Sequence, residues 1–221
     1  MFDKNSLTTI LKELESPHAV LVAVSKTKSV SAIKEVYDAG HKIFGENYVQ
    51  EIIDKHDQLP RDIQWHFIGH LQTNKVKYIS PFVSLIQSVD SLKLLKEINK
   101  EGEKINRIIP CLLQIHIAQE ETKFGFSFDE AGTLLNSDDL INLRHIRIKG
   151  FMGMTTLTND EQQIRKEFRS MKIFFDKIEK NPVPGVDCQL LSMGMTGDYK
   201  IALEEGSNMV RIGSAIFGER K

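Results

Sequence analysis

Short apolar runs alternate with segments of helical periodicity along this chain. The clearest run, residues 19–24 (AVLVAV), has six consecutive apolar residues and leads directly into Ser25, Lys26, Thr27 and Lys28. An unbroken apolar run of this length is typical of a strand that is buried on both faces. The pattern therefore predicts a core strand whose C-terminal edge carries Lys26.

The alternation continues to the end of the chain. Further strands are predicted over residues 42–44, 63–69, 84–89, 107–117, 146–152, 187–191 and 209–212. Helices are predicted over residues 2–14, 31–39, 48–56, 92–100, 129–135, 161–178 and 199–205. Strands that alternate with helix-sized segments call for a parallel sheet with helices outside it.

Eight strand segments favour closure into a single α/β domain over residues 1–221, a TIM-like (β/α)8 barrel with an extra N-terminal helix. If only six or seven segments were real strands, an open doubly wound sheet would be the alternative. No glycine fingerprint of the dinucleotide-binding type follows any strand, which weakens that alternative.

The composition limits the classes of binding partner that the chain is suited to. The chain has 29 Lys and Arg residues against 30 Asp and Glu, without a long run of one sign, so its field does not suit nucleic acid. No run of roughly 18 apolar residues occurs and the start lacks a signal-peptide layout, so we expect no membrane association and a cytoplasmic location. Cys111 and Cys188 lack metal-ligand spacing, which predicts buried free thiols and no metal site.

Lys26 is the first candidate for chemistry. An ammonium group beside an apolar strand is costly to keep charged, so we expect a lowered pKa and some neutral amine that can attack a carbonyl. Lys26 is therefore a candidate Schiff-base lysine, and Lys28 shares its face if the strand continues. The alternative is that Lys26 is only the first polar residue after a core strand.

Two loops are candidates for binding phosphate. In a barrel the loops after the strands share one face, and those after strands seven and eight often bind phosphate. Residues 192–197 (SMGMTG) and the turn at Gly213 and Ser214 offer small residues and hydroxyls at these two places. The alternative is that Ser192 and Thr196 only cap a helix and form turns.

A Schiff-base lysine beside a phosphate site suits either a sugar-phosphate aldolase or a protein that binds pyridoxal 5′-phosphate (PLP). Arg211, at the end of the last strand, would hold a pyridine nitrogen unprotonated because a guanidinium is always charged and only donates. An enzyme that uses the ring as a strong electron sink usually places an acid there. The alternative for Arg211 is a salt bridge across the barrel mouth.

Five segments carry a resemblance to a known family. They are residues 23–28 (AVSKTK), 44–51 (FGENYVQE), 65–75 (WHFIGHLQTNK), 192–196 (SMGMT) and 211–218 (RIGSAIFG). Along nearly its whole length the chain resembles the pyridoxal phosphate homeostasis proteins, the YggS/PROSC group, whose barrel is similar to the N-terminal domain of alanine racemase. Thr196 stands where the family has a serine and keeps the hydroxyl.

The resemblance implies roles for particular residues. It implies that Lys26 carries PLP as a Schiff base, that Arg211 faces the pyridine nitrogen, and that the phosphate is surrounded by Ser192, Gly194, Thr196, Gly213 and Ser214. It extends less firmly to Asn47, His66 and Lys123 in the cofactor pocket. It assigns no role to Lys28 or Lys75, and it supplies no catalytic residues.

The resemblance also implies a function: a carrier or regulator in intracellular PLP homeostasis, without established turnover. The implied partners are PLP and PLP-requiring apo-enzymes, and we expect a monomer. Two alternatives are a PLP-dependent amino-acid racemase and a cofactor-free Schiff-base aldolase. Since only three residues follow Gly218, we expect the C-terminal β-domain on which alanine racemase depends to be missing, and with it effective racemisation.

Overall fold

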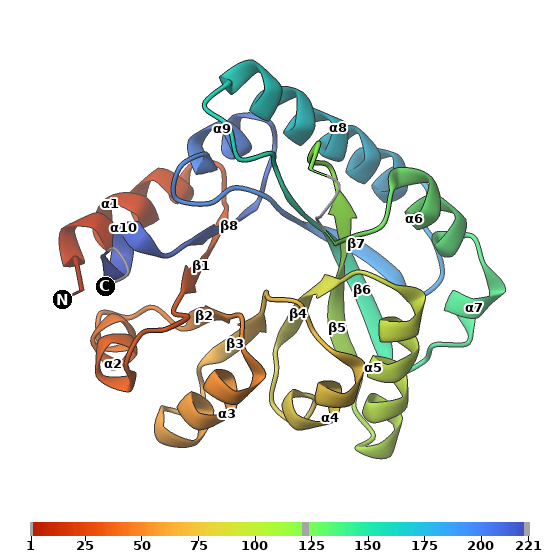
Figure 1. Ribbon diagram of the computed structural model, residues 1–221, viewed down its shortest axis with the longest axis horizontal. Helices are drawn as coiled ribbons and strands as arrows, with labels where there is room; N and C mark the ends of the chain where they lie inside the picture. The colour runs from red at the N-terminus through yellow and green to blue at the C-terminus, as the bar shows by residue number, and fades with distance from the viewer. Residues whose placement is uncertain (1, 121–123, 219–221) are drawn as a thin grey trace.

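The computed structural model describes residues 2–120 and 124–218 and is a closed barrel of parallel strands in chain order (Figure 1). The strands are β1 (Val20–Val24), β2 (Ile43–Glu46), β3 (Gln64–Phe67), β4 (Leu85–Val89), β5 (Ile109–His116), β6 (Ile146–Met154), β7 (Val186–Ser192) and β8 (Met209–Ile212). Pairing of β8 with β1 closes the ring, with Val20 opposite Met209 and Ala23 opposite Ile212. The predicted (β/α)8 barrel is confirmed, and the open doubly wound sheet is excluded.

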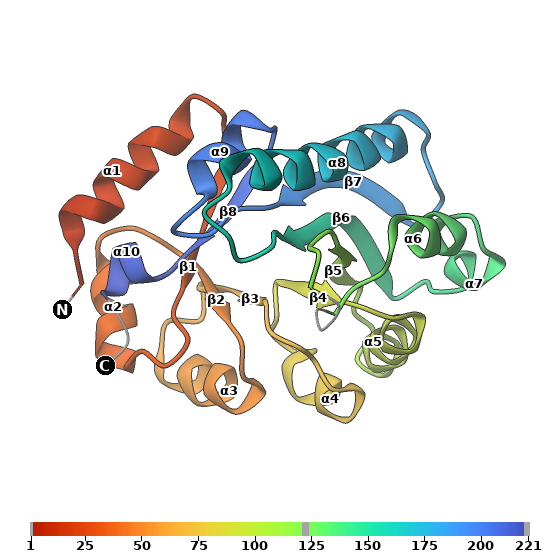
Figure 2. The same ribbon diagram turned by 45° about the horizontal axis from the view of Figure 1, so that its top comes forward.

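Helices cover the outside of the barrel. They are α1 (Lys4–Glu15), α2 (Val30–Asp38), α3 (Val49–Gln58), α4 (Val76–Ile79), α5 (Leu92–Lys104), α6 (Phe128–Leu135), α7 (Asp138–Ile141), α8 (Glu161–Lys180), α9 (Tyr199–Glu204) and α10 (Ser214–Phe217), with a 3-10 turn η1 (Thr73–Lys75) before α4. The predicted N-terminal helix is α1. It lies beside α10, where the Asp3 N–H donates to the Ile216 carbonyl at 2.9 Å (Figure 2).

Side-chain caps begin several of these helices. Asp3, Ser29 and Ser91 accept hydrogen bonds from backbone N–H groups in the first turns of α1, α2 and α5. Ser127 and Glu130 form a reciprocal capping box on α6. Such caps satisfy N–H groups that the helix itself leaves unpaired, which is why the helices begin close to the predicted residues.

The barrel interior changes from apolar to polar toward the carboxyl ends of the strands. One apolar layer consists of Val22, Leu85, Leu112, Met152 and Met209. Since alternate residues of a strand face the same side, the residues two positions further along also point inward. In β4, β5 and β8 these are the polar residues Gln87, Gln114 and Arg211, whereas in β1 and β6 they are Val24 and Met154. The polar interior therefore lies just below the loops that follow the strands.

Two smaller observations bear on the sequence predictions. Both cysteines are free, but Cys188 is half-buried rather than buried as predicted, and burial raises its pKa to about 12. No helix in the described parts of the chain is both long and apolar enough to cross a bilayer.

Candidate functional site

A cavity of about 300 Å³ opens at the carboxyl ends of the strands. Six of the predicted site residues line it, contributed by the loops after β1, β2, β7 and β8 and by the end of β8: Lys26, Asn47, Thr196, Arg211, Gly213 and Ser214. The structure therefore brings together residues that are up to 188 positions apart, as the barrel topology requires.

Of the other predicted residues, the described ones that do not line this cavity are His66, Gly194 and Ser192. His66 is 5% exposed inside the barrel, and burial lowers its pKa to about 3, so the imidazole is neutral. Its Nδ1 accepts from the Gln87 side-chain amide at 2.9 Å. Gly194 shapes the β7–α9 loop instead: its φ is +94°, and a Cβ there would lie 2.7 Å from the Ala202 Cβ. Lys123 lies outside the described residues.

Ser192, the third, faces the barrel interior rather than the cavity. Its hydroxyl donates to Gln87 Oε1 at 2.7 Å and accepts from Arg211 Nη1 at 2.6 Å. Ser192 belongs to the inward-facing positions of β7, because it is two residues beyond Leu190. With both hydrogen bonds in place, the Ser192 hydroxyl orients the Arg211 guanidinium.

Arg211 is 4% exposed and held by oxygens of β6 and β7. Its Nη1 donates to the Ser192 carbonyl at 2.8 Å, and its Nη2 donates to the Gly153 carbonyl at 2.9 Å. No carboxylate in the described ranges forms an ion pair with it, so the salt-bridge alternative receives no support. Burial lowers the pKa of Arg211 to about 10, which leaves the guanidinium charged at neutral pH.

The two lysines after β1 occupy different settings. Strand β1 ends at Val24, and Thr27 has a φ of 63°, so the strand does not continue to Lys28. Lys26 is half-buried and lines the cavity. Lys28 also lines it, but its ammonium donates to the carbonyls of Phe217 and Gly218 at 3.1 and 3.0 Å. Lys28 thereby fastens the end of α10 beside the cavity.

The β7–α9 loop is closed by Asp198. Its carboxylate accepts from the Met195 N–H at 2.6 Å and from the Thr155 hydroxyl at 3.0 Å. The N–H groups of Thr196 and Gly197 donate no hydrogen bond to the described residues. These donors and the nearby Thr196 and Ser214 hydroxyls can receive an anion.

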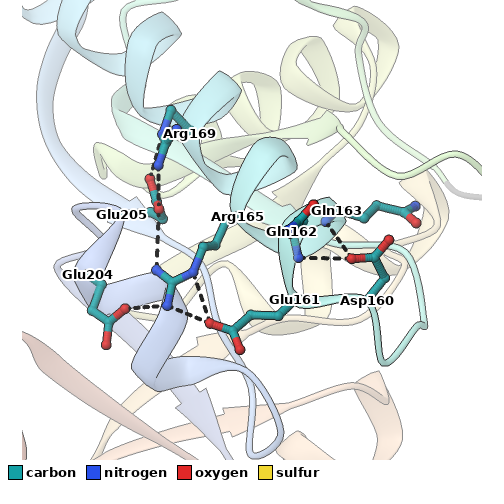
Figure 3. A network of polar contacts seen from close by, with 8 residues as sticks. All are labelled: Asp160, Glu161, Gln162, Gln163, Arg165, Arg169, Glu204 and Glu205. Atoms are coloured by element: carbon teal, nitrogen blue, oxygen red, sulfur yellow. Dashed lines mark hydrogen bonds and ion pairs between the residues drawn. The ribbon is translucent and has the colours of Figure 1, made fainter.

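Helix α9, which follows this loop, is tied to α8 by an ionic network (Figure 3). Arg165 contacts Glu161 at 2.7 Å, Glu204 at 2.6 Å and Glu205 at 3.4 Å. Arg169 contacts Glu205 at 2.9 Å. The network fixes the C-terminal end of α9 against the first half of α8.

A buried acceptor without a partner also lies at the cavity. The side-chain Oδ1 of Asn47 is buried and receives no hydrogen bond from residues 2–120 and 124–218. Leaving a buried carbonyl oxygen unpaired is costly, so such an atom commonly marks a place where a ligand or water donates. The cavity thus offers an amine, an unpaired acceptor, a buried guanidinium and a set of anion donors.

Apolar residues of the cavity were missed because only polar strand ends were considered in the sequence. Ile68, Met154 and Met195 form an apolar part of the lining. Their positions at or shortly after the ends of strands could have identified them in the sequence. The polar residues after β3 lie elsewhere: His70, Gln72 and Lys75 line a neighbouring cavity of about 680 Å³ that also touches Asn47.

Comparisons with known proteins identify the family. Residues 4–221 match the family described as the alanine racemase N-terminal domain. A pyridoxal phosphate homeostasis protein of Aquifex aeolicus is 38% identical over 204 residues, covering 92% of this chain and 88% of that protein. The resemblance predicted from the sequence is confirmed.

Solved structures extend the comparison. PipY of Synechococcus elongatus PCC7942, solved without PLP, has a TM-score of 0.90 and 30% identity and covers 97% of this chain and 99% of that one. PipY with PLP bound has a TM-score of 0.87 at 30% identity, with the same coverage of 97% and 99%.

Proposed function

Because this chain belongs to the family of pyridoxal phosphate homeostasis proteins, we propose that it binds PLP, holds it as a Schiff base on Lys26 and acts in PLP homeostasis inside the cell. The observation that carries the proposal is the meeting of Lys26, Arg211 and two hydroxyl-bearing loops around one cavity. Neither an isolated lysine nor an isolated anion site would suit this cofactor.

The residues of the cavity fit the chemical groups of PLP. When bound, the cofactor supplies an aldehyde that condenses with an amine and a pyridine ring that draws electron density. Lys26 provides the amine, and Thr196, Gly197 and Ser214 provide donors for the phosphate. Asn47 brings an unpaired acceptor into the cavity.

Arg211 favours a carrier over an enzyme. Its guanidinium stays charged, has no acceptor atoms and would keep a neighbouring pyridine nitrogen unprotonated, which weakens the ring as an electron sink. Among the described lining residues there is neither a tyrosine nor a histidine to act as a second base, and the Lys28 amine donates to two carbonyls. We therefore propose a carrier that acts as a monomer in the cytoplasm and passes PLP to apo-enzymes, rather than a racemase.

Reconstitution tests this function. Purified protein is incubated with PLP, desalted and examined for the visible absorbance of a lysine-bound cofactor. We expect a yellow protein, loss of the band in Lys26→Ala and a normal band in Lys34→Ala, a control at an exposed position of α2. A colourless wild-type protein would reject PLP binding and favour the cofactor-free aldolase.

A further inference from the structure

We propose that Lys55 and Glu51 on α3 are positioning residues that fix the loop carrying Lys26. This inference rests on the proposed function for its meaning, since it assigns a task to residues beyond the cavity lining. It comes from a buried ionic cluster behind that loop, formed by Glu46, Glu51 and Lys55. Neither the fold nor the cavity described above requires charges at these positions.

Lys55 is the centre of the cluster. Its side chain is 7% exposed, although it lies on a helix where a lysine could reach water. The ammonium donates to the Ser25 carbonyl at 2.9 Å, to Glu46 Oε1 at 2.8 Å and to Glu51 Oε2 at 2.8 Å. All three donors of the ammonium are therefore used.

The cluster holds the residues on both sides of Lys26. On one side, the Ser25 carbonyl accepts from Lys55 and the Ser25 hydroxyl donates to Glu46 Oε1 at 2.6 Å. On the other side, the Thr27 N–H donates to Glu51 Oε2 at 2.8 Å. Lys26 itself lies between two restrained neighbours.

The backbone of Thr27 is held in a conformation that its side chain disfavours. Its φ of 63° lies in the left-handed region, which a β-branched residue rarely adopts. A strained backbone persists only where surrounding contacts hold it. The hydrogen bond to Glu51 is such a contact, and it joins the strained residue directly to the cluster.

Charge balance supports a positional role. Two carboxylates share one ammonium, and Glu46 is completely buried, with no partner for its Oε2 in the described part of the chain. Burial raises the pKa of Glu46 against the opposing effect of Lys55. Burying such a cluster is often no more stabilising than well-packed apolar side chains. An apolar cluster could not provide the hydrogen bonds to Ser25 and Thr27, the residues on both sides of Lys26.

The test compares variants at position 51 in the apo-protein. Glu51→Ala removes the acceptor for the Thr27 N–H, whereas Glu51→Gln keeps an oxygen there. Glu35→Ala, at an exposed position of α2, is the matched control. We expect hydrogen exchange of the Thr27 amide to become about tenfold faster or more in Glu51→Ala, with most of the protection kept in Glu51→Gln. Unchanged Thr27 protection in Glu51→Ala would overturn the proposal.

A second readout examines the bound cofactor. We expect Glu51→Ala to weaken PLP binding about tenfold and to reduce the induced circular dichroism of each bound cofactor, with partial rescue by Glu51→Gln. A merely structural role would lower stability without changing the dichroism per bound cofactor, and that result would contradict positioning. If wild-type protein binds no PLP, the proposed function fails, while hydrogen exchange still decides whether the cluster fixes the loop.

Lys55→Met provides a third arm. It preserves length and burial but leaves Glu46 without its ion partner. We expect a smaller loss of Thr27 protection than in Glu51→Ala, because Glu51 remains as the acceptor but loses the ammonium that holds it. Unchanged protection would show that Lys55 does not position the loop. Should Lys55→Met fail to fold, the two Glu51 variants decide the question alone.

Discussion

At the scale of single residues, neighbouring polar side chains have different tasks depending on which way they face. Ser192 points into the barrel and contacts Arg211, whereas Thr196 and Ser214 line the cavity. The sequence identified all three as hydroxyls near a phosphate and had no means of separating them. The strand alternation that turns Ser192 inward becomes clear only when the end of β7 is known.

This difference predicts separate effects of removing each hydroxyl. Ser214→Ala and Thr196→Val should each weaken PLP binding about tenfold, since a charge-assisted hydrogen bond contributes roughly 1.5–3 kcal/mol. Ser192→Ala should change PLP affinity less and lower the free energy of unfolding by about 1–2 kcal/mol, because Gln87 and Arg211 each lose a partner. Equilibrium dialysis with PLP and with pyridoxal, which lacks the phosphate, separates the effects. If Ser192→Ala selectively lost affinity for PLP over pyridoxal, Ser192 would be a phosphate ligand.

His66 predicts a pH dependence of stability. Its pKa falls from 6.5 to about 3 because it is buried, so below pH 6.5 the unfolded chain takes up a proton that the folded chain does not. Stability should therefore fall as the pH drops from 6.5 toward 3, by up to about 1.4 kcal/mol per pH unit from this group. Urea unfolding of wild type and His66→Gln between pH 7 and pH 5 measures the slope, with His18→Asn as an exposed control. Parallel slopes for wild type and His66→Gln would contradict the prediction.

At the scale of elements, the boundaries of strands and longer helices were predictable, and the short helices were not. The predicted helix over 161–178 is α8 (Glu161–Lys180), where Asp160 provides the N-cap and Ile178 is the last apolar position, followed by the charged residues Glu179 and Lys180. By contrast, α7 and α10 have four residues each, too few for a helical period to be recognised. The cluster around Lys55 was also hidden, because a lysine four residues after a glutamate normally indicates an exposed helix face.

The network between α8 and α9 predicts unequal contributions from two adjacent glutamates. The Glu205 side chain is 8% exposed and contacts both Arg165 and Arg169, whereas Glu204 is 59% exposed and contacts only Arg165. Glu205→Gln should lower the free energy of unfolding by about 1 kcal/mol at pH 7, and Glu204→Gln by much less.

The same pair gives a pH test. Arg169 first, and then Arg165, hold the pKa of Glu205 below its usual value. Its contribution is therefore present above the ordinary glutamate pKa and is lost as the pH falls through the lowered one. The stability difference between wild type and Glu205→Gln should shrink in acid. A difference that is equal for both variants, or independent of pH, would show that the network is not what holds α9.

At the scale of the whole molecule, topology explains why distant residues could be predicted to meet. Eight strand segments imply that their carboxyl ends share one face, and six of the predicted residues meet there. What the pattern could not show is which inward positions lie below that face. His66 was assigned to the cofactor pocket, but its place in the barrel interior depends on strand tilt and register, which periodicity does not reveal.

The arrangement also predicts that this protein is not an effective racemase. Racemisation needs a base on each face of the amino acid, and the described lining adds to Lys26 only Lys28, which is engaged with two carbonyls. In deuterated buffer, PLP-loaded protein should exchange the α-proton of L-alanine at a rate little above that of free PLP. Turnover of about 1 s⁻¹ or faster, abolished in Lys26→Ala, would support the racemase instead.

The most direct test of the proposed function is to locate the cofactor on the chain. Protein loaded with PLP is reduced with borohydride, digested and mapped by mass spectrometry, which identifies the lysine that carries the pyridoxyl group. The cavity geometry predicts that the group is on Lys26. Finding it chiefly on Lys28 or Lys75, or finding none, would contradict the assignment of this cavity as the site where PLP is held.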